Sequence, residues 1–292
     1  MKMGQEYKII SYPICLSPSI PLPSSWKLFA DEMATGHGES NGGESRLGRE
    51  GDPILRSKKE PLFDVDFMAG AQVIHGASHS SMDGAFRHVI AAGGSVLAVS
   101  DDWRQGQILV MGETYGLQTV LDHLFYTHVV QRQVLQIHSS LIRVRNRGIL
   151  FLGPSGIGKT TQAELWHTFC GAEILNGDMA FVQKIEHGFL GWGSPWHGSS
   201  HYCMNASVPL CALVVLKQDK SNHLRLLEGF EKVTEISKNI FYPMWLEGGT
   251  EQCVETLDSL LCSLPVYELS CRPEEGAVIL LERELERNAL LS

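Results

Sequence analysis

Several features that would place this chain in a specialised class are missing from its sequence. Its seven cysteines form no Cys-x-x-Cys pair and have no metal-ligand spacing, so we predict neither a zinc site nor a disulfide framework. No run of about 18 apolar residues could span a membrane, and the first residues lack the apolar stretch of a signal peptide. We therefore expect a cytoplasmic protein with reduced thiols and no membrane partner.

Positive charge is also scarce. The 292 residues include 24 Lys and Arg against 33 Asp and Glu, which gives a formal net charge of −9 at pH 7. Nucleic-acid affinity comes largely from basic side chains that meet phosphates, so we expect no nucleic-acid partner. The sequence leaves the oligomeric state open, and a homo-oligomer is compatible with it.

A complete phosphate-binding motif, G-x-x-x-x-G-K-[ST], occupies residues 153–160. The apolar run at residues 148–152 predicts a buried strand before it, and residues 161–167 begin a helix after it. Glycines let the backbone turn its N–H groups toward phosphate oxygens at a helix N-terminus, which favours negative charge. Lys159 is expected to reach the outer phosphates of ATP, and Thr160 to offer its hydroxyl to Mg²⁺. The residues expected to bind the nucleotide are Gly153, Pro154, Ser155, Gly156, Ile157, Gly158, Lys159, Thr160 and Thr161.

A histidine is expected beside this loop. Residues 134–145 alternate like a strand, and residues 146–148 are a turn signal directly before the next strand. With a two-residue turn, Arg145 would face Gly148 and opposed residue numbers would add up to 293. This register places His138 opposite Ser155, inside the phosphate loop. A packing role for His138 at the strand end fits the sequence equally well.

Two further segments carry candidate site residues. Residues 172–178 predict a short strand that ends in Asp178, and an acid in this place supports the metal of phosphate-loop proteins. Residues 193–201 are dense in glycine, hydroxyls and imidazoles, which favours a loop that closes over a substrate; a surface turn anchored by a tryptophan is the alternative. Arg272 either faces the nucleotide or caps a surface pair. The residues expected to contact the substrate are Trp196, His197, Ser199, Ser200 and Arg272.

The pattern of elements predicts a mixed α/β chain with two domains. Short apolar runs between residues 63 and 110 indicate a small β-rich domain over residues 1–133, with a mobile loop at residues 35–53. Strands and helices alternate over residues 134–292. The predicted elements are strands at 7–12, 93–99, 107–111, 210–216 and 265–271, a hairpin over 180–192, and helices at 116–131, 230–242, 250–263 and 273–286.

Taken in order, these motifs resemble those of the HPr serine kinase/phosphorylase C-terminal domain family, which is related in fold to ATP-dependent phosphoenolpyruvate carboxykinase. The resemblance runs over residues 134–286 and is strongest for the small kinase-like members of bacteria, some of which act on peptides in natural-product clusters. The segments that carry it are Ile137-His138-Ser139-Ser140, the phosphate loop, the Asp178 strand, and Gly193-Ser194-Pro195-Trp196-His197-Gly198 followed by Asn205 and Pro209-Leu210.

The resemblance implies an HPr kinase-like phosphate-loop core and an ATP- and Mg²⁺-dependent transfer to serine in a protein or peptide. It assigns catalytic roles to His138, Lys159 and Asp178, and metal binding to Thr160 and Asp178. The family has a pair of aspartates where this chain has Gly177 and Asp178. Either Asp178 holds the metal and His138 is the base, or Asp178 is the base itself. A non-catalytic ATP-sensing module and a small-molecule kinase acting on free serine are the alternative functions; a carboxykinase-like reaction fits less well, because the region after the loop is poor in Arg and Lys.

Overall fold

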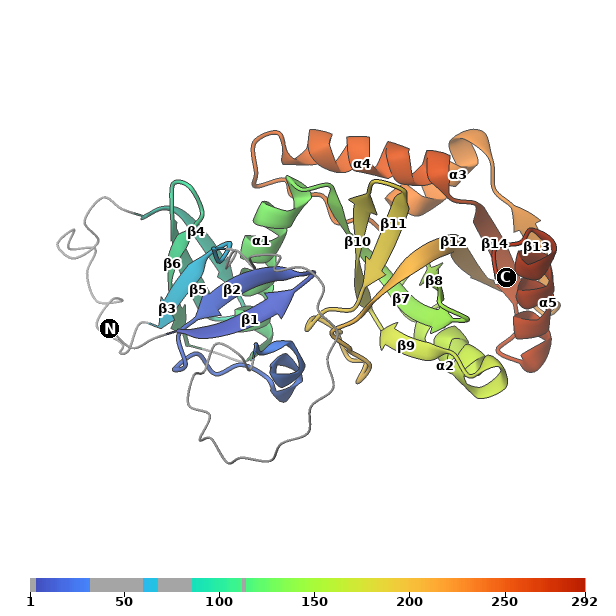
Figure 1. Cartoon of the computed structure of the whole chain (residues 1–292), viewed down its shortest axis with the longest axis horizontal. Coiled ribbons are helices and arrows are strands. Elements are labelled where there is room, and N and C mark those ends of the chain that lie inside the picture. The colour runs from blue at the N-terminus through green and yellow to red at the C-terminus, as the bar shows by residue number, and fades with distance from the viewer. Residues whose placement is uncertain (1–3, 32–59, 68–85, 112–113, 292) are drawn as a thin grey trace, which may run out of the picture.

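The computed structural model of the protein describes residues 4–31, 60–67, 86–111 and 114–291. The loop expected at residues 35–53 lies outside the described residues. Within them, the strands form two sheets, and helix α1 (Thr114–Val130) lies between the sheets (Figure 1). The mixed α/β class with mixed sheets agrees with the sequence-based prediction.

The first sheet is built from the N-terminal part of the chain. Among the described residues it has six strands in the order β1-β2-β3-β6-β5-β4, with the pairs β2–β3 and β3–β6 parallel. The predicted strand at residues 7–12 ends early, because Ile10 and Ser11 take left-handed φ angles of 51° and 63° and reverse the chain. The elements are β1 (Gln5–Ile9), β2 (Tyr12–Leu16), the 3₁₀ helix η1 (Ser24–Phe29), β3 (Asp64–Phe67), β4 (Phe86–Ala92), β5 (Ser95–Ser100) and β6 (Gln105–Val110).

The second sheet carries the phosphate-binding motif. Its strands β8, β12 and β14 are parallel neighbours, so their carboxyl ends share one edge, where the motif follows β8. The predicted hairpin at residues 180–192 is confirmed as β10 and β11. The strands are β7 (Val134–Val144), β8 (Arg147–Leu152), β9 (Glu173–Asn176), β10 (Met179–Ile185), β11 (Gly188–Trp192), β12 (Ser207–Gln218), β13 (His223–Leu226) and β14 (Val266–Cys271).

Four helices follow α1 in the described part of the chain: α2 (Lys159–Cys170), α3 (Gly229–Ser237), α4 (Gly249–Ser263) and α5 (Glu275–Arg287). The helix predicted at 230–242 ends earlier, at Ser237, because the backbone beyond it pairs with β7. There the N–H of His138 donates to the carbonyl of Asn239, and the N–H of Phe241 donates to that of Gln136. None of the described helices is long and apolar enough to cross a bilayer.

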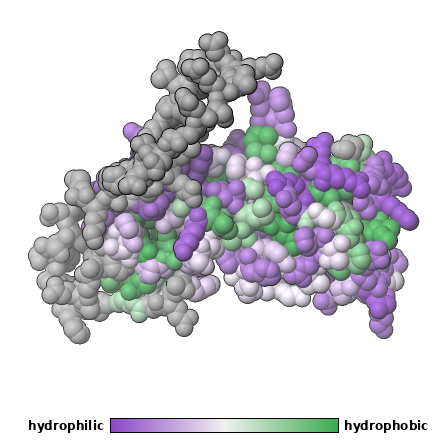
Figure 2. Space-filling model, turned by 60° about the horizontal axis from the view of Figure 1, so that its bottom comes forward, coloured by the Kyte–Doolittle hydropathy of each residue, from purple (hydrophilic) through white to green (hydrophobic). Residues whose placement is uncertain are grey.

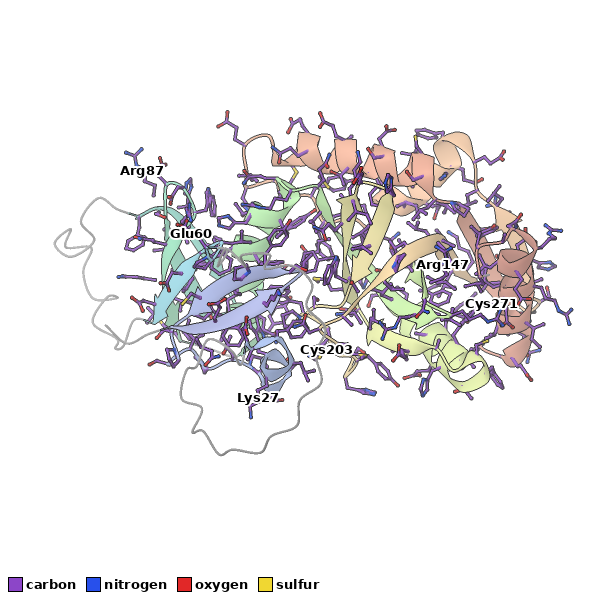
Figure 3. All side chains as sticks on the ribbon, in the orientation of Figure 1. Lys27, Glu60, Arg87, Arg147, Cys203 and Cys271 are labelled. Carbon is purple, nitrogen blue, oxygen red and sulfur yellow. The ribbon has the colours of Figure 1, made fainter. Side chains whose placement is uncertain are left out.

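The β7–β8 turn corrects the predicted register. Val144 pairs with Arg147, so opposed numbers add up to 291 and the turn residues are Arg145 and Asn146. Both take left-handed φ angles, 48° and 60°, as a two-residue hairpin turn requires, while Arg147, marked in Figure 3, remains in the strand. The expected pairing of Arg145 with Gly148 is therefore wrong.

A continuous core joins the two sheets. Trp26 of η1 and Trp196 of the loop after β11 pack edge to face with ring centroids 5.4 Å apart, and Trp196 also contacts Phe125 of α1 and Phe181 of β10. A second cluster lies between the parallel strands and helices α2 and α5. Apolar and polar residues intermingle on the described surface seen in Figure 2. All seven cysteines are free.

Candidate functional site

The phosphate loop connects β8 to α2 through three glycines with left-handed backbone. Gly153, Gly156 and Gly158 have φ angles of 140°, 78° and 112°, which other residues rarely adopt. A Cβ on Gly156 or Gly158 would meet nothing within 4 Å. These positions therefore need glycine for its backbone conformation rather than for lack of room, and the space beside the loop is open. Such space is what the backbone N–H groups need to approach a phosphate group.

Lys159, His138 and Asp178 converge at this loop from three different elements. The Nζ of Lys159, the first residue of α2, lies 3.0 Å from Nε2 of His138 on β7. The same Nε2 lies 3.2 Å from Oδ1 of Asp178, in the turn between β9 and β10. Lys159 is 6% exposed and also donates to the carbonyl of Gly153 at 3.2 Å. His138 thus reaches the lysine despite the different register.

The electrostatics of this cluster favour a charged Asp178. The hydrogen bond from His138 lowers the pKa of Asp178; burial opposes this shift, and the charges of His138, Lys159 and His197 add to it. Burial lowers the pKa of Lys159, and the charge of Asp178 partly offsets this effect. The carboxylate therefore stays ionised to lower pH than an ordinary aspartate.

Thr160 and Asp178 could hold a metal ion only together with ligands from elsewhere. The Thr160 hydroxyl donates to the carbonyl of Gly177 at 2.9 Å, which leaves its oxygen lone pairs available. Within the described residues, no group of three or more His, Cys, Asp or Glu side chains could bind a metal. Mg²⁺ commonly uses one or two protein oxygens and completes its shell with substrate phosphates and water, so the donor set fits that ion.

Asn176, which the sequence analysis missed, fixes the turn that carries Asp178. Its side chain is fully buried, and Oδ1 accepts from the N–H groups of Asp178 and Met179 at 2.9 and 2.7 Å. Its Nδ2 donates to the carbonyls of Ser194 and Trp196. One amide therefore holds both the Asp178 turn and the loop after β11. The sequence does contain a signal for this role, because Asn176 is a polar residue at the end of an apolar strand and directly before Gly177-Asp178.

Asn239, also missed, ties the phosphate loop to the strand of His138. Its Oδ1 accepts from the N–H of Gly153 at 3.0 Å, and its backbone carbonyl accepts from the N–H of His138 at 2.8 Å. Asn239 is 6% exposed. It lies 80 positions beyond Lys159 in the sequence, where no motif marks it.

The loop after β11 contains a core residue rather than a substrate contact at Trp196. Trp196 is 4% exposed, and its Nε1 donates to the carbonyl of Gln118 at 3.0 Å. Its ring is enclosed by the aromatic cluster, so the expectation that it contacts a substrate is wrong for the structure as described. His197 is half-buried, with Nδ1 against the carbonyl of Ser200. Ser199 is exposed and Ser200 is half-buried.

Two glycines allow this loop to touch the Gly177–Asp178 turn. A Cβ placed on Gly177 would lie 1.9 Å from Oγ of Ser200, and one placed on Gly198 would lie 2.1 Å from Oδ2 of Asp178. Neither position has room for a side chain. The place that the resemblance assigns to a second carboxylate is taken here by the Ser200 side chain.

A pocket of about 370 Å³ opens on another side of the phosphate loop. Arg272 lines it, so it faces this pocket rather than the His138 cluster; Arg272 also lies 3.7 Å from Glu274. Cys271, labelled in Figure 3, marks the end of β14 where the pocket begins. The lining residues are Gly156, Ile157, Gly158, Thr161, Gln162, Leu216, Lys217, Gln218, Asp219, Cys271, Arg272 and Pro273.

Comparison with known proteins leaves the family open. No protein-family model matches the chain, and no curated protein matches it. Among solved structures, the chain is similar to the HPr(Ser) kinase/phosphatase from Coxiella burnetii, with 12% identity and a TM-score of 0.30. The match covers 53% of this chain and 96% of that one. At this level of similarity, the function has to be argued from the site itself.

Proposed function

We propose that the chain is a cytoplasmic, HPr kinase-like enzyme that transfers the γ-phosphoryl group of ATP, with Mg²⁺, to the hydroxyl of a serine in a protein or peptide. The observation that carries this proposal is the convergence of Lys159, His138 and Asp178 at the mouth of a glycine-rich phosphate loop. Phosphoryl transfer depends mainly on positioning and charge neutralisation, and this cluster offers a cation, a carboxylate and an imidazole within hydrogen-bond reach of one another.

The phosphates would be held by Lys159 and the loop N–H groups, with Thr160 and Asp178 on the Mg²⁺ ion. Bound Mg²⁺–ATP supplies the transferable group and neutralises its charge. Arg272 and Thr161 line the pocket of about 370 Å³, which has the size for part of the nucleoside. The nucleotide would then lie across the loop, with its outer phosphates toward Lys159.

The contacts of His138 suit it to proton handling. One imidazole nitrogen cannot accept from Lys159 and donate to Asp178 at the same time. When Lys159 turns toward phosphates, Nε2 keeps Asp178 as its partner, and the pair can take the proton of the acceptor hydroxyl. General-base help of this kind contributes typically about 10²–10⁴-fold. In the same proposal, residues 1–133 recognise the rest of the protein or peptide that carries the acceptor serine.

Mass spectrometry after incubation with Mg²⁺–ATP and a library of serine-containing peptides tests the proposal. We expect a gain of one phosphoryl group on a peptide serine, and loss of this activity in Lys159→Ala. Lys184→Ala is the matched control, because Lys184 donates to Ser259 away from the loop. Normal transfer by Lys159→Ala would overturn the mechanism.

The ATP-sensing module is the second candidate. The observation in its favour is that a single carboxylate stands at the Gly177–Asp178 turn, while the Ser200 side chain occupies the other place. Binding of ATP measured by calorimetry, with no transfer to any peptide or protein serine, would support the sensor and exclude the kinase.

A further inference from the structure

The residue nearest to the place for a second carboxylate is itself a potential phosphoryl acceptor. Ser200 approaches Gly177 so closely that a Cβ on that glycine would lie 1.9 Å from its Oγ and 2.6 Å from its Cβ. The N–H of Gly177 donates to the carbonyl of Tyr202 at 3.1 Å, which clamps the two segments together. The Ser200 hydroxyl is thereby held against the turn that presents Asp178.

This position lies beside the turn that contacts Thr160 and presents Asp178. The Gly177 carbonyl accepts from the Thr160 hydroxyl at 2.9 Å, and the next residue, Asp178, contacts His138 at 3.2 Å. On the other side of the turn, Gly198 lets the loop pass directly over Oδ2 of Asp178. A serine of the chain's own loop therefore packs against the same turn that contacts Thr160 and carries Asp178.

The surroundings hold Ser200 in place but leave its hydroxyl chemically available. Its Oγ accepts from the N–H of Tyr202 at 3.2 Å, an interaction that orients the oxygen without using its proton. Its own N–H donates to the carbonyl of His197 at 3.0 Å, and this closes a tight turn over Gly198 and Ser199. Ser200 is half-buried, whereas Ser199 is exposed, and among the described residues no hydrogen bond comparable to those of Ser200 orients its side chain.

We propose that Ser200 is phosphorylated within the same molecule, by the site beside which it lies. This inference rests on the proposed kinase function. The Ser200 Oγ forms a bond to the γ-phosphorus of ATP while the bond between that phosphorus and the β–γ bridging oxygen breaks. ADP leaves, and the hydroxyl proton passes to the His138–Asp178 pair and then to water. The product is a phosphoserine with a charge of about −1.5 to −2.

Phosphorylation would also change the loop. The packing of Oγ against Gly177 leaves no room for a phosphoryl group, so the Ser200 side chain has to turn away from Gly177 as the group is transferred, and the charge of the phosphate then repels the Asp178 carboxylate. The modified Ser200 therefore moves away from the Gly177–Asp178 turn and exposes it. An external serine can then occupy the place that Ser200 held.

The experiment uses the purified full chain with Mg²⁺–ATP and no added acceptor. After removal of nucleotide, intact mass and peptide fragmentation should find one phosphoryl group on Ser200. The rate should not depend on protein concentration, because the reaction is intramolecular. The phosphate should be absent in Ser200→Ala and Lys159→Ala and retained in Ser221→Ala, an exposed serine whose hydroxyl contacts His223.

Ser200→Thr keeps a hydroxyl and should yield phosphothreonine at the same position, which guards against a folding defect in Ser200→Ala. Phosphate on Ser199 or elsewhere, or a rate proportional to protein concentration, would overturn the inference. So would an unmodified chain that hydrolyses ATP or phosphorylates a serine peptide. Failure of the kinase function has a different signature: no transfer to the chain or to any peptide, with ATP binding measured separately by calorimetry.

Discussion

His138 and Asp178, 40 positions apart in the chain, are joined by a contact of 3.2 Å between Nε2 and Oδ1. This contact is the main reason that the pKa of Asp178 is lowered from 3.8. Because the folded-state pKa lies below the unfolded value, the contact stabilises the fold above the unfolded pKa. The stabilisation is lost as pH falls through the folded pKa.

Replacing Asp178 should therefore weaken the acid dependence of stability. We expect Asp178→Asn to lose less free energy of unfolding than the wild type between pH 5 and pH 2.5, measured by urea denaturation. Asp258→Asn, at an exposed position on α4, is the control and should follow the wild type. If the free energy of unfolding of Asp178→Asn falls as steeply toward low pH as that of the wild type, the contact between His138 and Asp178 is not formed in solution.

A side chain at position 177 should destabilise the protein unless a smaller residue also replaces Ser200. Gly177→Ala places a Cβ against both Oγ and Cβ of Ser200, and overpacking of this kind costs typically about 1–3 kcal/mol. The double variant with Ser200→Gly should recover most of the loss, whereas that with Ser200→Ala should not, because it keeps the Cβ. Additive free energies in this double-mutant cycle would contradict the packing.

Trp196 should behave as a core residue. Removing its ring leaves a cavity among Trp26, Phe125 and Phe181, so Trp196→Ala should lower the free energy of unfolding by about 3–5 kcal/mol. Phe230→Ala, at a side chain that is 85% exposed, should change it by less than about 0.5 kcal/mol. Equal effects of the two substitutions in urea denaturation would show that the Trp196 ring does not pack in the core.

Asn239 should affect the phosphate loop through Gly153. Asn239→Ala leaves the buried Gly153 N–H without its acceptor, which costs about 1–3 kcal/mol of stability and weakens ATP binding. Asn239→Asp keeps an acceptor oxygen but loses the Nδ2 donor to the Glu235 carbonyl and adds a negative charge beside the loop, so it should also weaken ATP binding, measured by calorimetry. ATP affinity equal in both variants and the wild type would mean that the loop does not need this bond.

The carboxyl group of Asp122 should make the stability of the protein change with pH in the direction opposite to that of Asp178. Burial raises its pKa from 3.8 to about 7, and the hydrogen bond from Gln136 partly offsets this. Between these values the folded state holds a proton that the unfolded state has released, so stability falls as pH rises. Asp122→Asn should remove this decline and be more stable than the wild type at pH 8 by roughly 1–3 kcal/mol. A wild-type stability that is flat from pH 5 to pH 8 would contradict the shift.

The local elements of the second sheet could be predicted because their signals are local. The strand predicted at 210–216 lies within β12, and the hairpin predicted over 180–192 is formed by β10 and β11. The β7–β8 register could not be predicted in the same way. It depends on which two residues take left-handed angles, and Arg145 gave no propensity signal for doing so.

The sequence by itself determined the chemistry available to this protein: the phosphate loop with Lys159 and Thr160, a carboxylate after the next strand, and a histidine on the strand before. These follow from short motifs whose residues act through their immediate neighbours. Tertiary structure decided which groups meet. It buried Trp196 among rings from three distant segments, turned Arg272 toward the pocket, tied Gly153 to Asn239 and set Ser200 against Gly177. Such contacts depend on long-range packing, which no local pattern specifies.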